Sequence, residues 1–389
     1  MKFTATALAL ASAVSSVEGA VLGERATYAV KGAAEGFAKG VTGGGSAACA
    51  VPSSTAQLKT WLSDSTARCI VLDKEFNFKG TEGTVTEDGC RPASNKCPGN
   101  GGQDAINQAS WCTNGNAGAG SSTIKVTYDK AGISGLTVGS NKSIIGAGSK
   151  GVLRGKGLRI ANGAKNVIIQ NIHITELNPQ YIWGGDAIAV DGSDNVWIDH
   201  NKFSLIGRQM VVLGNGASNR VTISNNEFDG STSWSATCDG HHYWTIYLTG
   251  SNDLVTLKGN YIHHTSGRSP KTGGNSLIHA VNNYWYANSG HAFDNGAGAK
   301  VVAEGNVFQN VVTPLLDNKG NFFGSPSTGA NAACSANLGH VCQLNAFGSS
   351  GSLGGTDTSF LGNFAGKNVA GAAAASAGTI QNGAGVGKV

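Results

Sequence analysis

Charged residues are scarce in this sequence: they make up 13 % of the 389 residues, about half of the ~25 % that is usual in globular domains. The 28 lysines and arginines are scattered, so there is no basic stripe of the kind that binds nucleic acid. Beyond the N-terminus no apolar run is long enough for a membrane-spanning helix. The 58 glycines follow no Gly-X-Y period, which excludes collagen. We therefore expect neither a nucleic-acid-binding protein nor a membrane protein.

The first twenty residues have the features of a secretory signal peptide. Lys2 supplies a positive charge, residues 4–17 are rich in alanine and leucine, and the small residues Gly19 and Ala20 follow. The sequence thus predicts a secreted, extracellular protein in which residues 1–20 are removed and residues 21–389 form one domain.

Eight cysteines form an even set, and secretion makes disulfides their expected state. The sequence alone leaves the connectivity open, although the two most C-terminal cysteines would close a small loop. There is no Cys-x-x-Cys pair, which speaks against a zinc cage. The eight residues are Cys49, Cys69, Cys90, Cys97, Cys112, Cys238, Cys334 and Cys342.

A repeat of short aliphatic runs that end in asparagine starts near residue 140. The asparagines lie 25, 34, 22 and 24 residues apart, at Asn201, Asn226, Asn260, Asn282 and Asn306, and Asn171 belongs to a shifted copy. Such a period, with glycine and asparagine between short strands, predicts parallel β-coils stacked into a solenoid. An antiparallel sandwich is the alternative, but the asparagine keeps its place over more than 100 residues.

The repeat also predicts which way side chains point. Alternation turns Val196 and Ile198 inward and Trp197 and Asp199 outward. An asparagine at each bend can form a hydrogen-bonded ladder from coil to coil. The longer interval between Asn226 and the next repeat predicts a long loop, where functional residues gather.

Two ends of the chain lack the repeat. Residues 20–140 are expected to form the N-terminal coils and a long capping loop. The tail 347–389 is rich in glycine, alanine and serine and is expected to pack on the outside, with a short helix over residues 368–377.

Three charged residues stand in neighbouring repeats among apolar and glycine-rich coils: Asp186, Arg208 and Arg268. Stacked coils would let them face one another. Each taken alone could be a surface ion pair or a turn arginine. The sequence contains no nucleophile elbow, P-loop or dinucleotide fingerprint in the required context.

Aromatic residues accompany these charges, at Trp183, Tyr243 and Trp244. Aromatic faces suit the rings of sugars, and a groove along a solenoid suits a long polymer. The paired histidines His241-His242 and His263-His264 would point to opposite faces of a strand, so we interpret them as structural rather than as metal ligands.

At these positions the sequence closely resembles the pectin lyases. The likeness covers nearly all of residues 30–345, although the 196–200 segment is shared with the wider pectate lyase superfamily. The matching segments are WGGDA at 183–187, VWIDH at 196–200, IGRQ at 206–209, ATCDGHHYW at 236–244, TSGRSPK at 265–271 and SGHAF at 289–293.

This resemblance implies a right-handed parallel β-helix that cleaves methyl-esterified polygalacturonan by β-elimination, with no metal or other cofactor. It implies that Arg268 is the base that removes the C5 proton and that Arg208 and Asp186 lie beside it. Substrate-binding residues would be Lys271, Trp183, Tyr243, Trp244 and Trp111. The disulfides would be Cys90–Cys112, Cys97–Cys238 and Cys334–Cys342, which leaves Cys49 to pair with Cys69.

The residues also explain why an ester would be preferred to a carboxylate. A methyl ester acidifies the neighbouring C–H more than a carboxylate does, and cations aimed at the enolate stabilise it. A carboxylate substrate would need neutralisation by calcium, which requires clustered carboxylates, and Asp186 has few acidic companions. Arginine normally stays protonated, so Arg268 could be the base or only a cation that stabilises the enolate.

Other functions remain to be weighed against this one. A calcium-dependent pectate lyase is disfavoured by Arg208, and a galacturonan hydrolase would need a carboxylate pair that the sequence lacks. A non-catalytic polysaccharide-binding β-helix would have the same groove without turnover.

Three further expectations concern details of the chain. The segment Cys90–Cys97 lacks a tryptophan that the family often has, so Arg91 and Lys96 are expected to make one wall of the cleft thinner and more cationic. Asn141 starts the one Asn-x-Ser/Thr sequon and is a candidate glycosylation site. No assembly surface is evident, so we expect a monomer.

Overall fold

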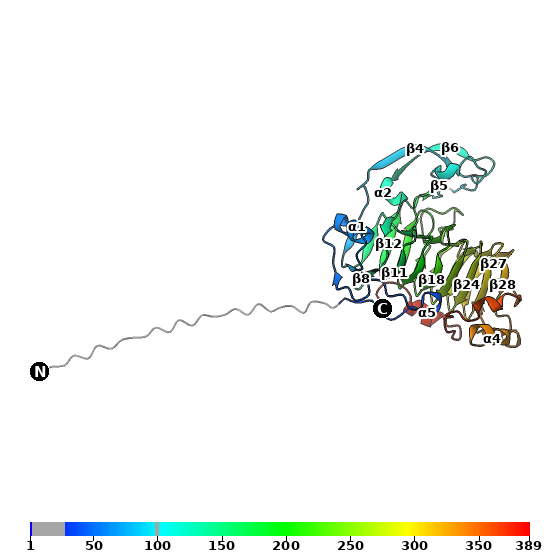
Figure 1. The fold of residues 1–389 in the computed structure, drawn as a ribbon. Coiled ribbons are helices and arrows are strands. Elements are labelled where there is room, and N and C mark those ends of the chain that lie inside the picture. The colour runs from blue at the N-terminus through cyan, green and yellow to red at the C-terminus, as the bar shows by residue number, and fades with distance from the viewer. Residues whose placement is uncertain (2–27, 98–100) are drawn as a thin grey trace.

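The computed structural model describes residues 1, 28–97 and 101–389, so the expected signal peptide lies outside the described residues apart from Met1. The chain winds into coils whose strands stack in parallel along two long sheets (Figure 1). The ten strands of the first sheet, in spatial order, are β1 (Cys49–Ala50), β2 (Arg68–Leu72), β8 (Lys142–Gly146), β11 (Lys165–Gln170), β15 (Asp194–Asp199), β18 (Asn219–Ser224), β21 (Asp253–Lys258), β24 (Ser276–Val281), β26 (Lys300–Glu304) and β28 (Asn321–Phe323).

The second sheet has fifteen strands and bends around a corner. Strand β25 pairs through its first residues with β22 and through its last two with β23, so the sheet forms two faces of the solenoid. Its strands are β3 (Glu75–Asn77), β9 (Val152–Arg154), β12 (His173–Leu177), β16 (Lys202–Ile206), β19 (Glu227–Asp229), β22 (Tyr261–His263), β25 (Tyr284–Asn295), β23 (Lys271–Thr272), β20 (Ile246–Leu248), β17 (Val211–Leu213), β14 (Ile188–Asp191), β10 (Leu158–Ala161) and β7 (Leu136–Val138), with β27 (Val307–Asn318) and β29 (Ala346–Gly348) at the C-terminal end. The parallel β-helix expected from the repeat is confirmed, and the antiparallel sandwich is excluded.

An arm of mixed strands projects from the stack and arches over it (Figure 1). It is a four-stranded sheet in the order β13 (Tyr181–Ile182), β5 (Asp104–Ala105), β4 (Thr84–Arg91) and β6 (Ser122–Asp129), in which β4 runs antiparallel to both of its neighbours. This arm is the long capping loop expected from the N-terminal third of the sequence.

The interior of the solenoid follows the predicted alternation. Val196 and Ile198 are fully buried in the main core, whereas Trp197 points outward. Trp197 is nevertheless covered, because Ala34 and Ala38 of the N-terminal segment pack against it. Burial of such apolar side chains in every coil contributes about 1.5–3 kcal/mol for each large residue.

The asparagine ladder exists, with one correction. Side-chain amides bond from coil to coil through Asn201, Asn226, Asn260, Asn283, Asn306 and Asn345. Asn283, and not Asn282, is the rung, because the register pairs Val255 with Ile278 rather than with Leu277. Asn282 stands one residue earlier with φ 53°, as Asn225 does with φ 52°. The bend therefore needs two residues: one that tolerates the left-handed conformation, and a ladder asparagine after it.

The helices of the described residues are short and lie outside the coils. They are α1 (Thr55–Ser63), α2 (Lys130–Ile133), α3 (Thr328–Asn331), α4 (Ser335–Leu338) and α5 (Ala377–Gly383), with 3₁₀ turns η1 (Gly36–Ala38), η3 (Gln108–Ser110), η4 (Ala332–Cys334) and η5 (Leu361–Phe364). Within the described residues, none of the helices is long and apolar enough to cross a membrane.

The C-terminal tail packs over the outer faces of both sheets. Phe364 of η5 lies against Phe37 with 6.1 Å between ring centroids, and Ile380 of α5 packs against Tyr284. The expected helix over 368–377 is wrong: the helix is α5, which begins after Ser376, whose hydroxyl accepts a hydrogen bond from the Thr379 N–H.

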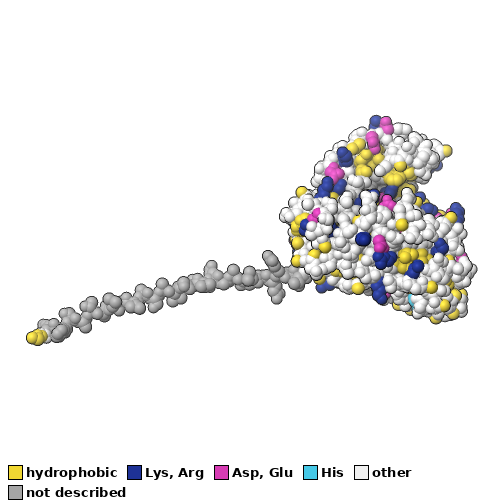
Figure 2. Space-filling view, viewed as in Figure 1, with side chains coloured by type: hydrophobic (Ala, Val, Ile, Leu, Met, Phe, Trp, Pro, Cys, Tyr) yellow, Lys and Arg dark blue, Asp and Glu magenta, His cyan; other side chains and the backbone are white. Residues whose placement is uncertain are grey.

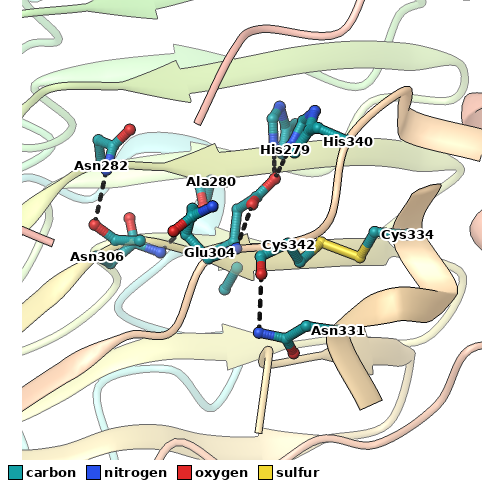
Figure 3. A network of polar contacts seen from close by, with 12 residues as sticks. His279, Ala280, Asn282, Glu304, Asn306, Asn331, Cys334, His340 and Cys342 are labelled. Atoms are coloured by element: carbon teal, nitrogen blue, oxygen red, sulfur yellow. Dashed lines mark hydrogen bonds and ion pairs between the residues drawn. A yellow bond between two sulfur atoms is a disulfide. The ribbon is translucent and has the colours of Figure 1, made fainter. Parts of the chain in front are cut away.

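A polar network fastens the segment with α3 and α4 to the last coils (Figure 3). His279 and His340 both donate to Glu304 Oε1 at 2.8 Å, and the Gln343 N–H donates to Oε2 at 2.8 Å. Burial works against ionisation of Glu304, but the hydrogen bonds from the two imidazoles lower its pKa to about 2. The same bond raises the pKa of His340. Glu304 thus remains a charged acceptor that ties the segment with α3 and α4, the C-terminal cap, to β26.

Candidate active site

A cavity of about 680 Å³ lies between the arm and the stack. Figure 2 shows the molecule hollowed between these two parts. Ser94, Trp111 and Asn116 of the arm form one wall, and residues of successive coils and of the loop 230–245 form the others. This loop joins β19 to β20 and is the insertion predicted from the long interval between Asn226 and Asn260. The described residues that line the cavity include no aspartate or glutamate.

Asp186 and Arg208 form a bidentate ion pair at the base of the cavity. Arg208 Nε and Nη2 each lie 2.8 Å from a different oxygen of Asp186. Asp186 precedes β14 and Arg208 precedes β17, and these strands are adjacent in the sheet. The guanidinium also lies 3.8 Å from the centroid of the Trp183 ring. The Arg208 guanidinium is therefore fixed in orientation by the Asp186 carboxylate on one side and by the Trp183 ring on the other.

Arg268 precedes β23, two coils beyond Arg208, and has a different electrostatic setting. Among the residues that the structure describes, no carboxylate forms an ion pair with Arg268 (the ion pairs include Arg208–Asp186 and Lys271–Asp294). Its guanidinium lies over the rings of Trp244, Tyr247 and Tyr243, at 4.7, 5.4 and 5.7 Å from the centroids. Arg268 is thus a cation that aromatic faces hold above the cavity without neutralising it.

Lys271 does not line the cavity. It stands on β23, next to Tyr247 of β20, and its Nζ lies 2.6 Å from Asp294 Oδ2. The structure therefore places Lys271 beside the site with its charge already paired.

The aromatic residues predicted to bind substrate all line the cavity. Trp111, Trp183, Tyr243 and Trp244 stand on its walls, and Tyr243 packs edge-on against Trp244 at 4.9 Å. Tyr247 is an additional lining residue. It was missed, although alternation along β20, with Ile246 and Leu248 buried, points it outward.

Within the described residues, three buried polar atoms of the cavity walls have no hydrogen-bond partner: Trp183 Nε1, Gln209 Oε1 and Arg268 Nε. Buried polar groups are normally paired. The unpaired Arg268 Nε agrees with a guanidinium that is held by aromatic rings rather than by hydrogen bonds.

His242 connects two walls of the site from beneath. Its Nε2–H donates to the carbonyl oxygens of Arg208 and Trp244, at 2.8 Å each. Complete burial lowers the pKa of His242, so the ring is neutral. This agrees with its interpretation as a structural histidine.

Disulfides fix both sides of the cavity. Cys90–Cys112 crosses the arm, and Cys97–Cys238 joins the arm to the loop 230–245. Cys334–Cys342 closes the C-terminal cap and Cys49–Cys69 joins β1 to β2. These are the pairs that the resemblance implies.

The arm does not carry the extra positive charge expected from Arg91. Arg91 Nε and Nη2 lie 2.8 and 3.0 Å from the two oxygens of Asp104, so its charge is paired. Lys96 is exposed, and neither residue lines the cavity. The wall is instead small and polar at Ser94 and Asn116.

Two groups of side chains outside the cavity have the donor atoms of a metal site: His279 with Glu304 and His340, and Glu227 with Asp229 and His263. In the second, Lys202 Nζ lies 2.8 Å from Glu227 and 3.3 Å from Asp229, so a cation already stands between the carboxylates. In the first, the imidazoles donate to a shared carboxylate oxygen. Neither group contributes to the cavity.

Comparison with known proteins identifies the family of this chain. The family model described as "Pectate lyase" matches residues 112–389. A pectin lyase of Colletotrichum gloeosporioides is 65 % identical over 366 residues, covering 94 % of this chain and 95 % of the relative. Pectin lyase B of Emericella nidulans is 57 % identical over 394 residues and covers both chains fully.

Solved structures show the same fold. A pectate lyase of Bacillus sp. N165 in complex with trigalacturonate has a TM-score of 0.57 at 21 % identity, covering 91 % of this chain and 99 % of that chain. At this identity the likeness establishes the parallel β-helix alone.

Proposed function

The chain belongs to the pectin lyases, within the pectate lyase family, and we propose that its cavity cleaves pectin by β-elimination at Arg268 without a metal ion. The protein is accordingly a polysaccharide lyase whose substrate is methyl-esterified galacturonan. The site residues, the absence of a metal requirement and the place of action are proposals.

The observation that carries the proposal is the pairing of the three cations. Arg208 is neutralised by Asp186 and Lys271 by Asp294, whereas Arg268 has no carboxylate partner in the described part of the chain. A carboxylate beside a guanidinium would hold its proton in place. Arg268 is thus the arginine of this site that no described carboxylate holds in its protonated form, so it is able to act on a substrate atom.

The charge of the cavity fits an ester. A uronate carboxylate would have to be neutralised before its C5 proton could leave, and calcium does this only where several carboxylates converge. Here Asp186, the carboxylate beside Arg208, has both oxygens bonded to that arginine. A neutral methyl ester needs no such compensation, so the donor set supports pectin rather than pectate as the substrate.

The elimination requires a base at C5 and donors at the ester carbonyl. In this step Arg268 acts from its neutral guanidine form: it takes the C5 proton and becomes a guanidinium, the C–H electron pair forms the C4–C5 double bond, and the bond from C4 to the glycosidic oxygen breaks. The departing oxygen takes a proton from solvent water. During this step negative charge develops on the ester oxygen. Arg208 uses Nε and Nη2 for Asp186, which leaves Nη1 to donate to that oxygen.

The proposed place of action is outside the cell, and the proposed form is a monomer. Four disulfides support an extracellular protein, since such bonds persist in oxidising compartments. Asn141 is exposed at the residue before β8, which supports the proposal that it is glycosylated.

Replacing Arg208 by alanine tests the electrostatic part of this proposal. We expect kcat/KM on highly methylated pectin to fall about 10- to 100-fold, because the enolate loses a preorganised donor. Initial rates over a range of pectin concentrations give the ratio.

Arg220 provides a matched control for this variant. It forms a bidentate pair with Asp194 on the outside of the stack, so Arg220→Ala should leave kcat/KM unchanged within twofold. If Arg208→Ala retained the activity of Arg220→Ala, Arg208 would have no role in the reaction.

A further inference from the structure

The backbone N–H of Arg268 donates to a side chain rather than to the backbone of the next coil, whereas its carbonyl accepts the usual coil-to-coil bond from the Ile246 N–H at 2.7 Å. On either side of it, the usual coil-to-coil bonds are present: the His291 N–H donates to Ser266 O at 3.3 Å and the Ser269 N–H donates to Ala292 O at 3.0 Å. The Arg268 N–H instead donates to His291 Nε2, at 3.2 Å.

The local backbone explains this exchange of partners. Arg268 has φ 44°, in the left-handed region, which turns its N–H away from the ladder. Gly267 precedes it, and a Cβ there would collide with both Tyr243 and His291. The His291 ring packs edge-on against Tyr243 at 5.7 Å, and Tyr243 is one of the rings under the Arg268 guanidinium. The imidazole, the phenol ring and Arg268 are therefore one packed unit.

We propose that His291 is a positioning residue for the reaction: its neutral imidazole accepts the Arg268 N–H and thereby fixes the guanidinium over the reacting carbon. This inference rests on the proposed function of Arg268. Since Nε2 must offer its lone pair, the ring carries its proton on Nδ1.

Protonation of His291 would undo this arrangement. Nε2 would then bear a proton facing the Arg268 N–H, and the new positive charge would stand beside Arg268 and Lys271. Burial lowers the pKa of His291, Arg268 and Lys271 lower it further, and Asp294 and Asp317 oppose them. The hydrogen bond from the Arg268 N–H to His291 is therefore lost on the acid side of pH 6.5, the ordinary pKa of histidine. Tyr243 also faces the ring, edge-on.

Kinetics of two variants separate positioning from mere packing. We expect His291→Ala to lower kcat on pectin about tenfold with KM within twofold, because one hydrogen bond that orients Arg268 is lost. In His291→Gln an amide oxygen replaces Nε2 as the acceptor, so most of kcat should return. The acid limb of the kcat profile, present in the wild type, should be absent in His291→Gln.

His173 offers a matched control. Its imidazole is half-buried, with Nε2 2.8 Å from Ser204 Oγ, and burial lowers its pKa to about 4. It stands on β12, outside the residues that line the cavity. His173→Gln should leave the acid limb unchanged. An acid limb with the same midpoint in His291→Gln as in the wild type would overturn the proposal, as would an unchanged kcat in His291→Ala.

A direct readout does not depend on activity. In protein labelled with ¹⁵N-arginine, the amide resonance of Arg268 should shift with the midpoint of the His291 titration in the wild type and stay constant in His291→Gln. An Arg268 amide resonance that does not shift as His291 titrates would contradict the inference. Full activity in Arg268→Ala would contradict the proposed function, but it would leave the amide titration of Arg268 in the wild-type protein as expected. The failure of the proposed function and the failure of this inference are therefore distinguishable.

Discussion

Replacement of Arg268 by alanine should lower kcat/KM on highly methylated pectin by about a thousandfold, equivalent to about 4 kcal/mol of transition-state stabilisation. Arg268 lines the cavity without a carboxylate partner among the described residues, and as the proposed base it is the group placed at the reacting carbon, so its loss removes that group. Binding should persist, because Trp111, Trp183 and Tyr243 still line the walls. Steady-state kinetics and the affinity of the variant for pectin, measured separately, give the two quantities.

Lys271→Ala is the informative control for this experiment. Lys271 stands close to Arg268 in the sequence and is also a cation, but its Nζ already forms an ion pair with Asp294. We expect it to cost less than tenfold. Equal losses in the two variants would mean that net positive charge, and not the position of Arg268, supports the reaction. Undiminished turnover in Arg268→Ala would remove Arg268 from the mechanism.

A second large effect is expected in stability, from Asn260→Ala. Asn260 is fully buried, its Nδ2 donates to Ile223 O and Asn283 Oδ1, and its Oδ1 accepts from the backbone N–H and side-chain Nδ2 of Asn226. Alanine leaves these groups without partners inside the bend. The free energy of unfolding should fall by about 3 kcal/mol, which chemical denaturation measures.

Asn275→Ala serves as the comparison for the ladder. Asn275 is an exposed asparagine whose Nδ2 lies 3.5 Å from Asn252 Oδ1. Its replacement should change the free energy of unfolding by less than about 0.5 kcal/mol. A similar small change for Asn260→Ala would show that the ladder contributes little to stability.

The sequence predicts the solenoid well because its signal is repeated in every coil. It places the ladder one residue too early at one rung, since Leu277 and Ile278 both fit the aliphatic position and two asparagines follow. Only the hydrogen-bond register between coils decides between Asn282 and Asn283. The tail helix is misplaced for a local reason: the helix-starting role of Ser376 carries more weight than the alanine content before it.

The site is predicted in part, and for different reasons. Arg208 and Asp186 belong to short segments in neighbouring repeats, so stacking brings them together. Tyr247 could have been found from alternation along its strand. The contact between Arg268 and His291 could not, because it depends on a left-handed backbone conformation that turns one N–H away from the ladder. The ion pair of Arg91 with Asp104 likewise needs the fold of the arm.

Ultraviolet absorbance during the reaction tests the central claim most directly, because elimination creates a conjugated double bond and hydrolysis does not. Highly methylated pectin and polygalacturonate are each incubated with the protein, in calcium and in a chelator. Metal-free elimination at an ester-binding cavity predicts a rise on pectin that the chelator leaves unchanged, and little rise on polygalacturonate. A rise confined to polygalacturonate with calcium would contradict the account.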